Sequence, residues 1–441
     1  MFYYNTRWAF KLADDSPPAI AGGIIAASAL TRPQLIQRAR KTVKHHPYLQ
    51  HRLFDSQLYL ADIDAQMAAG AVVNLGTYPW FRCAPAEYQS SQQVGGVAQW
   101  KAEQSAQLLA TWPRTAATDP REIAECTRAS IEHQHALGCE AIILPSPMTR
   151  TPGTYVSEAA WIDAGLDACR ELRVVLPVYA TIAIADTALR QQTPGHSPFL
   201  QTVSAQIAAR PGLAGAYIVL AQETEDGYCC KVPDTLLALL LLTDDLVRGA
   251  GRDVIVNYMG TFGAVATGAG AKIWATGYNR SQRRLRSSDM DDTTGRQYPR
   301  YFSAELLGDV GLEEELDLVA AHAVRSRVMF DSPSAAQLNQ VLRSGGRVSD
   351  VAEWQYRQGN SAAAAAHYNS VMHHLGMLLE GIAPERRVDV VHKVLIHAER
   401  VASQVSEAIT MNGRRTRGYT DITPQQIWRT TYENWRCIAG V

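Results

Sequence analysis

The sequence lacks the patterns that mark several common protein classes. Its seven cysteines are scattered over 441 residues without a CxxC pair, which argues against a zinc ribbon and a disulfide framework. The formal net charge is −1, so overall charge provides no attraction to nucleic acid or an anionic membrane. The apolar run 236–247 is interrupted by Asp244 and Asp245 and is too short to span a bilayer. With no signal-peptide pattern at the start, we expect a soluble cytoplasmic protein that does not bind membranes.

Motifs for metal binding or covalent catalysis are missing as well. The sequence has no HExxH, no Asp-rich calcium loop, no GxSxG and no Walker A loop. His133 and His135 are two residues apart near a helix end, and His373 and His374 are adjacent, so neither pair shares a helix face. The sequence therefore predicts no metal site.

What the chain does contain is an alternation of short apolar runs and longer helical patterns from about residue 50. Near-continuous apolar runs indicate strands that are covered on both faces, as in parallel sheets. About eight such steps over roughly 250 residues are what a (β/α)8 TIM-like barrel requires, and a doubly wound open parallel sheet is the alternative. The expected strands are 52–55, 71–76, 140–145, 174–182, 215–220, 253–259, 272–277 and 298–303. The expected helices between them are 97–112, 119–138, 157–172, 197–212 and 233–249.

The two ends of the chain depart from this alternation. Residues 1–49 are expected to form an N-terminal cap, with a strand near the start and a helix over 31–46. From about residue 310 the patterns are helical, so a helical C-terminal domain of residues 331–441 is expected beyond a barrel domain of residues 50–330. Three roles for this helical region stay open: capping the barrel mouth, forming a homo-oligomer, or binding a protein partner.

Polar residues at the carboxyl ends of the expected strands mark the expected site, because parallel barrels bind ligands there. Asp55 and Glu223 are the carboxylates best placed for catalysis, since two carboxylates in a partly dry mouth can divide the roles of acid and base. The alternative for such an aspartate is a hydrogen bond to the next loop. The residues expected to orient the substrate are Gln57, Tyr78, Tyr179, Gln222, Asn257, Tyr258 and Thr276.

The segment 253–286 contains a candidate anion site. Gly260 and Gly263 form a turn that leads into a short helix, and backbone N–H groups at such a turn attract phosphate or carboxylate. Arg280 begins a basic cluster beyond the next strand, and arginine binds phosphate in a bidentate manner. Two alternatives stay open: the glycines permit close helix packing, and nearby aspartates neutralise the arginines.

Two partial resemblances bear on function. The segment 260–277 is similar in layout to the turn and strand that hold the FMN phosphate in flavin-binding barrels, which implies FMN as a candidate cofactor. A barrel that uses aspartates also resembles the tRNA-guanine transglycosylase family, although the cysteine cluster that binds zinc in that family is missing here. Both resemblances concern the fold, and fold alone does not assign a reaction.

The sequence thus predicts a metal-independent barrel enzyme, a transferase or hydrolase, that acts on a small phosphate-bearing or nucleotide-like substrate. Glycosyl-type transfer or hydrolysis is the chemistry that suits two carboxylates without a metal. One alternative is a non-catalytic binding or assembly module that uses the helical C-terminal region, and another is a flavin-dependent oxidoreductase. A nucleic-acid partner has in its favour only the basic cluster and three tyrosines near it, Tyr278, Tyr298 and Tyr301.

Overall fold

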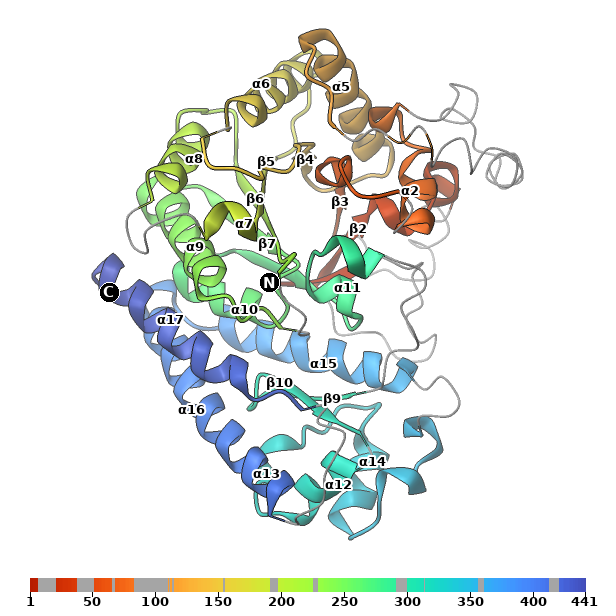
Figure 1. Ribbon diagram of the computed structural model, residues 1–441, viewed down its shortest axis with the longest axis vertical. Coiled ribbons are helices and arrows are strands. Elements are labelled where there is room, and N and C mark those ends of the chain that lie inside the picture. The colour runs from red at the N-terminus through yellow and green to blue at the C-terminus, as the bar shows by residue number, and fades with distance from the viewer. Residues whose placement is uncertain are drawn as a thin grey trace.

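An eight-stranded parallel sheet forms the centre of the protein in a computed structural model, and it curls into a nearly closed barrel (Figure 1). Strands that follow one another in the chain are neighbours in the sheet, and β1 pairs with β8. At the seam between β3 and β4, the Glu140 N–H donates to the Arg52 carbonyl over 3.0 Å. The expected (β/α)8 barrel is therefore confirmed. The structure describes residues 1–6, 21–37, 51–65, 68–82, 110, 112, 115–153, 155–190, 197–224, 229–290, 300–312, 314–355, 361–411 and 420–441.

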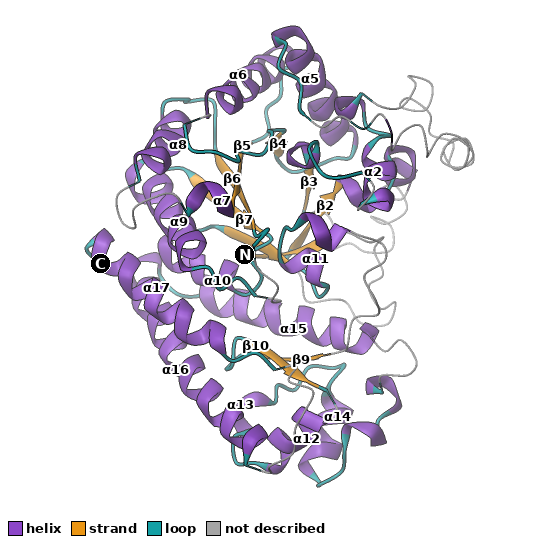
Figure 2. Ribbon diagram, in the orientation of Figure 1, coloured by secondary structure: helices purple, strands orange, loops and turns teal. Residues whose placement is uncertain are grey.

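Helices surround the barrel strands, as Figure 2 shows in purple around orange. The barrel strands are β1 (Phe2–Thr6), β2 (Gly22–Ala26), β3 (Arg52–Asp55), β4 (Ile142–Leu144), β5 (Val178–Ala185), β6 (Gly215–Ala221), β7 (Asp253–Asn257) and β8 (Ile273–Thr276). The helices that follow them are α2 (Ala69–Leu75), α5 (Pro120–Ala136), α6 (Tyr155–Glu171), α7 (Asp186–Leu189), α8 (Pro198–Ala208), α9 (Pro233–Asp244), α10 (Phe262–Val265) and α11 (Arg280–Arg283). The expected helices that start at residues 119, 157, 197 and 233 are confirmed, whereas most of 97–112 lies outside the described residues.

The N-terminal segment contributes two barrel strands, which differs from the expected cap. β1 lies between β8 and β2, and β2 pairs with β3. Tyr4 and Asn5 interrupt the apolar character of β1, so this strand lacks the continuous run used to recognise the others. The expected helix over 31–46 is present over residues 32–37, and its remainder lies outside the described residues.

Two of the expected barrel strands are wrong. Residues 69–75 form α2, because Ala71, Val72 and Leu75 fall on one helical face and are buried together. The run 298–303 supplies β9 (Arg300–Ser303), which pairs antiparallel with β10 (Gly308–Gly311) outside the barrel. Short apolar runs do not separate these cases by pattern alone, since a buried helix face and a buried strand look alike over six residues.

Alternating side chains of the strands build two hydrophobic layers. In β6, Tyr217 and Val219 belong to a cluster that occupies the barrel interior and continues past β3 to α2 and α5. Ile218 and Leu220 belong to the second cluster, which lies between the sheet and the helices. This period of two decides which polar side chain faces the interior and which faces a helix.

The C-terminal region packs against one side of the barrel (Figure 1, lower half). Its helices are α12 (Glu314–Ala321), α13 (Arg325–Val328), α14 (Ala336–Arg343), α15 (Ser361–Glu380), α16 (Pro384–Thr410) and α17 (Thr423–Ala439). A Cβ on Gly376 of α15 would lie 2.9 Å from the Phe2 Cβ, and the Phe262 and Trp428 rings are 5.7 Å apart. The outer hydrophobic cluster therefore continues from the barrel into this region.

The domain boundary expected at residue 330 stays a prediction, and α12 and α14, which lie on either side of it, contact each other. The β9–β10 hairpin, α12 and α13 lie beside α14 in Figure 1, away from the barrel strands. None of the helices in the described ranges combines the length and the apolar character required to cross a membrane.

Candidate functional site

Asp55, the last residue of β3, lies at the carboxyl end of the barrel and is 1% exposed. Its Oδ1 accepts a hydrogen bond from the Gln57 N–H over 3.0 Å. Its Oδ2 accepts from the Tyr59 hydroxyl over 2.5 Å and from the Tyr217 hydroxyl over 2.8 Å. Since Tyr217 belongs to β6, the carboxylate joins two strands that are not neighbours in the sheet.

The surroundings of Asp55 favour its protonated form. Burial raises its pKa from 3.8 to about 6, and the hydrogen bonds from Tyr59, Tyr217 and the Gln57 backbone act in the opposite direction. These partners are all neutral, so no positive charge among them stabilises the carboxylate. A carboxyl group that titrates near neutral pH can both donate and accept a proton, which is the requirement for general acid–base catalysis.

A second chain of hydrogen bonds connects the loops after β2, β3, β6 and β7. The Ser28 N–H donates to Gln57 Oε1 over 2.7 Å, and Gln57 Nε2 donates to the Tyr258 hydroxyl over 3.0 Å. Gln222 Nε2 donates to the Tyr258 carbonyl over 3.0 Å. Gln57 and Tyr258 both have left-handed backbone conformations, with φ of 52° and 60°. Such conformations are unusual for residues other than glycine and often occur at functional sites.

Asn257 connects this chain to the carboxylate. Its Nδ2 donates to the Tyr217 hydroxyl over 2.6 Å, and its Oδ1 accepts from the Tyr258 N–H over 2.8 Å. The predicted residues Asp55, Gln57, Gln222, Asn257 and Tyr258 are therefore brought together in one buried network, which we call the lumen network together with Tyr59 and Tyr217.

The segment from Arg280 to Met290, which we call the mouth segment, lies against the carboxyl ends of the strands. In Figure 1, α11 stands in front of the barrel strands. The Gln222 N–H donates to the Leu285 carbonyl over 2.8 Å, and Leu285 also forms a bridge with Ala221. Leu285 and Met290 are buried in the interior cluster. The mouth segment thus covers the lumen network on the side of β6 and β7.

The arginines of the mouth segment are engaged in ion pairs. Arg283 pairs with Asp309, and both side chains are less than 5% exposed. Arg284 Nε lies 2.7 Å from Asp289 Oδ2, and this pair is buried as well. The expected pairing with a nearby aspartate is confirmed for Arg284 and Asp289, although this pair is buried and not on the surface, whereas Arg283 pairs with the more distant Asp309. Arg280 begins α11, but its side chain lies outside the described residues, so its role in anion binding stays a prediction.

The Gly260–Gly263 turn has a packing explanation. Gly260 has a φ of 54°, and its carbonyl accepts from the Gly263 N–H over 3.2 Å. A Cβ on Gly263 would lie 3.3 Å from the Trp274 Cβ, so the absence of a side chain lets α10 approach β8 closely. Phosphate binding at this turn, and with it FMN, stays a prediction.

Glu223 lies on the rim of the barrel, outside the lumen network. Its carboxylate accepts hydrogen bonds from the Ser287 N–H and hydroxyl, the latter over 2.6 Å. Asp186, directly after β5, is fully buried, and its Oδ2 accepts from the Thr224 N–H over 3.1 Å. The hydrogen bond to Asp62 raises the pKa of Arg150, and the charges of Glu223 and Asp186 raise it further. The rim thus contains a cluster of carboxylates around one arginine.

Three other predicted residues face elsewhere. Tyr78 is buried beside Phe54 on the helix side of β3, and its hydroxyl donates to the Leu30 carbonyl over 2.9 Å. Tyr179 lies at the start of β5, because that strand extends to Ala185, and its hydroxyl donates to Asp253 at the amino end of the barrel. Thr276 faces outward, where its hydroxyl lies 3.2 Å from that of Tyr368. These positions do not favour substrate contact.

Tyr217 and Asp186 belong to the site but were not predicted from the sequence. Tyr217 lies in the middle of the run 215–220, which was interpreted only as a buried strand. Its alternation with Ile218 could have placed it in the barrel interior. Asp186 was overlooked because β5 was expected to end near residue 182.

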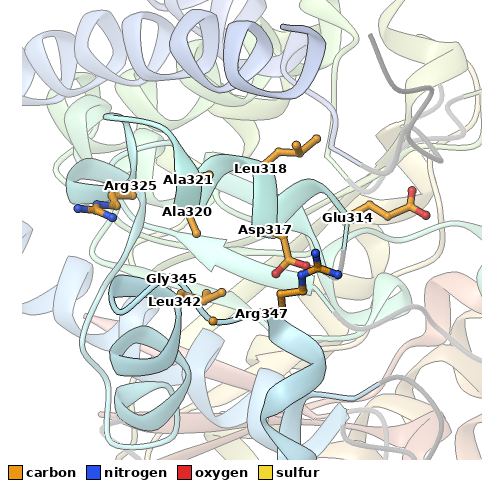
Figure 3. A pocket seen from close by; sticks show the side chains of 10 residues that line it. Glu314, Asp317, Leu318, Ala320, Ala321, Arg325, Leu342, Gly345 and Arg347 are labelled. Atoms are coloured by element: carbon orange, nitrogen blue, oxygen red, sulfur yellow. The ribbon is translucent and has the colours of Figure 1, made fainter. Parts of the chain in front are cut away.

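Cavities lie elsewhere in the described parts of the chain, and one of about 670 Å³ lies between the end of α6, the start of β5 and the end of α8. Another, of about 620 Å³, lies between α12, the start of α13 and the turn after α14 (Figure 3), with Asp317, Ala320, Leu342 and Arg347 among its lining residues. A third, of about 300 Å³, lies beside Trp80 and the start of α5. None of these three cavities is lined by the lumen network.

Comparison with known proteins identifies no relative of this chain among families or curated proteins. No protein-family model matches the chain, and no curated protein matches it. The functional inference therefore depends on the position, burial and hydrogen bonds of the lumen network.

Proposed function

We propose that this chain is a barrel enzyme in which Asp55 carries out acid–base or nucleophilic chemistry on a small nucleotide-like substrate. The observation that supports this proposal best is a buried carboxyl group with a pKa of about 6 at the carboxyl end of a parallel barrel. Essentially all characterised TIM-barrel enzymes have their active site at this end. Glycosyl-type transfer or hydrolysis remains the reaction class that suits carboxylates acting without a metal.

In this proposal each member of the lumen network has a defined task. The hydroxyls of Tyr59 and Tyr217 donate to one oxygen of Asp55 and hold its carboxyl group in a fixed orientation. Asn257 donates to the oxygen of Tyr217, which strengthens the Tyr217 O–H as a donor. When Asp55 is ionised, these hydrogen bonds stabilise the charge, and when it is protonated it can deliver its proton to a leaving group.

Glu223 is the second carboxylate in this proposal, as expected from the sequence. Its contact with Ser287 ties it to the mouth segment on the same rim. Asp186 is the alternative, because it is fully buried and its Oδ1 has no hydrogen-bond partner among the described residues. Separate Glu223→Gln and Asp186→Asn variants would identify which carboxylate limits turnover.

A screen for release of the free base tests the proposal. Ribonucleosides, deoxynucleosides and their 5′-monophosphates are incubated with the full chain and analysed by mass spectrometry. Asp55→Asn keeps the size of the side chain and should reduce turnover by about 100-fold or more. Asp163→Asn is the control, because Asp163 pairs with Arg210 on the surface. Full turnover in the Asp55→Asn variant would rule out the assigned role of Asp55.

An assembly module is the second candidate, supported by apolar side chains on the C-terminal helices. Met377 and Leu378 of α15 are 58% and 56% exposed, and Met411 and Ile438 are also exposed. Neighbouring exposed apolar side chains such as Met377 and Leu378 contribute to the patches that mark protein contacts. If the assembly role is correct, Met377→Ser with Leu378→Ser lowers the molar mass measured by light scattering, and Asp55→Asn leaves that mass unchanged.

A further inference from the structure

Two buried side-chain oxygens at the carboxyl end of the barrel have no hydrogen-bond partner among the described residues. One is Oδ1 of Asn5, the second-last residue of β1. The other is Oε1 of Gln222, the first residue after β6. Both side chains are fully buried. A buried acceptor without a donor costs about 1 to 3 kcal/mol, and native proteins contain few such groups. A donor from another molecule would remove this cost.

The two amide groups are oriented by their nitrogen atoms. Gln222 Nε2 donates to the Tyr258 carbonyl over 3.0 Å, and Asn5 Nδ2 donates to the Gln282 carbonyl over 3.3 Å. In each amide group, the nitrogen therefore has a hydrogen-bond partner and the oxygen has none among the described residues. Both residues also lie beneath the same stretch of the mouth segment, since the Gln222 N–H donates to the Leu285 carbonyl. Both residues thus contact the backbone of one short segment, Gln282 to Leu285, at the carboxyl end of the barrel.

We propose that Gln222 and Asn5 are specificity-determining residues that accept hydrogen bonds from N–H or O–H donors on an uncharged part of the substrate. This inference rests on the proposed function, because it takes the carboxyl end of the barrel, where Asp55 lies, as the substrate site. The chemical class is a neutral heterocycle with amino or amide N–H groups, or a sugar with hydroxyl groups. Sites built to pair with such donors reject analogues that lack them, because the buried acceptors are then left unpaired.

A phosphate group does not fit these two positions. Phosphate oxygens are acceptors, and they would face the acceptor oxygens of both amides. Arg283 and Arg284, which lie between the contacted residues Gln282 and Leu285, are already paired with Asp309 and Asp289. The recognition of the substrate in the lumen is therefore assigned to its uncharged part.

Equilibrium binding to the full chain tests this inference. The probes are adenosine, purine riboside (which lacks the amino group of adenosine), D-ribose and inorganic phosphate, each measured by isothermal titration calorimetry. Gln222→Met and Asn5→Leu remove the acceptor with little change in size. Gln404→Met is the matched control, because Gln404 of α16 also has an unpartnered Oε1 but lies in the C-terminal region. Circular dichroism confirms that each variant is folded.

We expect adenosine or ribose to bind, and each acceptor variant to bind the same probe about tenfold more weakly. If adenosine binds more tightly than purine riboside, the two acceptors recognise the heterocycle. If the two bind equally, the acceptors recognise the sugar. Unchanged affinity in both variants, no binding of either neutral probe, or binding of phosphate alone would each overturn the inference. Binding without any turnover would leave this inference standing and count against the proposed reaction.

Discussion

Replacing Asp55 with asparagine should change how the stability of the protein depends on pH. The pKa of Asp55 is about 6 in the folded chain and close to 3.8 when the chain is unfolded. Between these values the folded state holds the proton more tightly, so the free energy of unfolding falls as pH rises through this window. The difference of about two pH units corresponds to about 3 kcal/mol. Asp55→Asn carries no titrating proton and should escape this loss.

The assay is urea unfolding of wild type and Asp55→Asn at several values from about pH 4 to about pH 7. The difference between the two proteins isolates Asp55, because other titrating groups contribute equally to both, including His133, which acts in the opposite direction. Burial, followed by the charge of Arg32, lowers the pKa of His133 to about 3, so the stability it provides is lost as pH falls below 6.5. Relative to the variant, wild type should lose stability as pH rises. A difference that is constant with pH would refute the argument that Asp55 is protonated near pH 6.

Four further substitutions test individual contacts by urea unfolding. Tyr217→Phe removes a hydroxyl that makes two hydrogen bonds in the lumen, and should cost about 1 to 3 kcal/mol. Asp309→Asn removes the charge that partners buried Arg283 and should cost about 3 to 5 kcal/mol, whereas Asp331→Asn in a surface pair should cost less than about 1 kcal/mol. Equal losses of stability in Asp309→Asn and Asp331→Asn would contradict the stronger dependence of buried Arg283 on its partner. His133→Leu should stabilise by about 1 kcal/mol, because neither ring nitrogen has a partner among the described residues.

The architecture could be predicted from sequence where strands are covered on both faces. Six of the eight barrel strands, from β3 to β8, produce the continuous apolar runs that this environment requires. β1 was not assigned to the barrel because polar atoms of Asn5 and Tyr4 lie within it. Residues 71–76 were predicted to form a strand because Val72 and Val73 are β-branched. They form a helix, in which the spacing of Ala71, Val72 and Leu75 places these side chains on one buried face.

The composition of the site could be predicted only in part. Asp55, Asn257 and Gln222 end or follow strands, so their place at the rim follows from topology alone. The contact between Asp55 and Tyr217 depends on closure of the barrel, which brings β3 and β6 within reach of one another. No local pattern encodes that distance. Likewise, the pairing of Arg283 with Asp309 depends on how the β9–β10 hairpin docks against the mouth segment.

The pH dependence of turnover tests the central claim most directly. With a substrate identified by the base-release screen, kcat/KM of wild type should show an inflection near pH 6, set by Asp55. Tyr217→Phe removes a hydrogen bond that lowers this pKa, so its inflection should move to higher pH. An inflection that stays in place in Tyr217→Phe, or a profile without any inflection in this range, would contradict the assignment of Asp55 as the group that carries the chemistry.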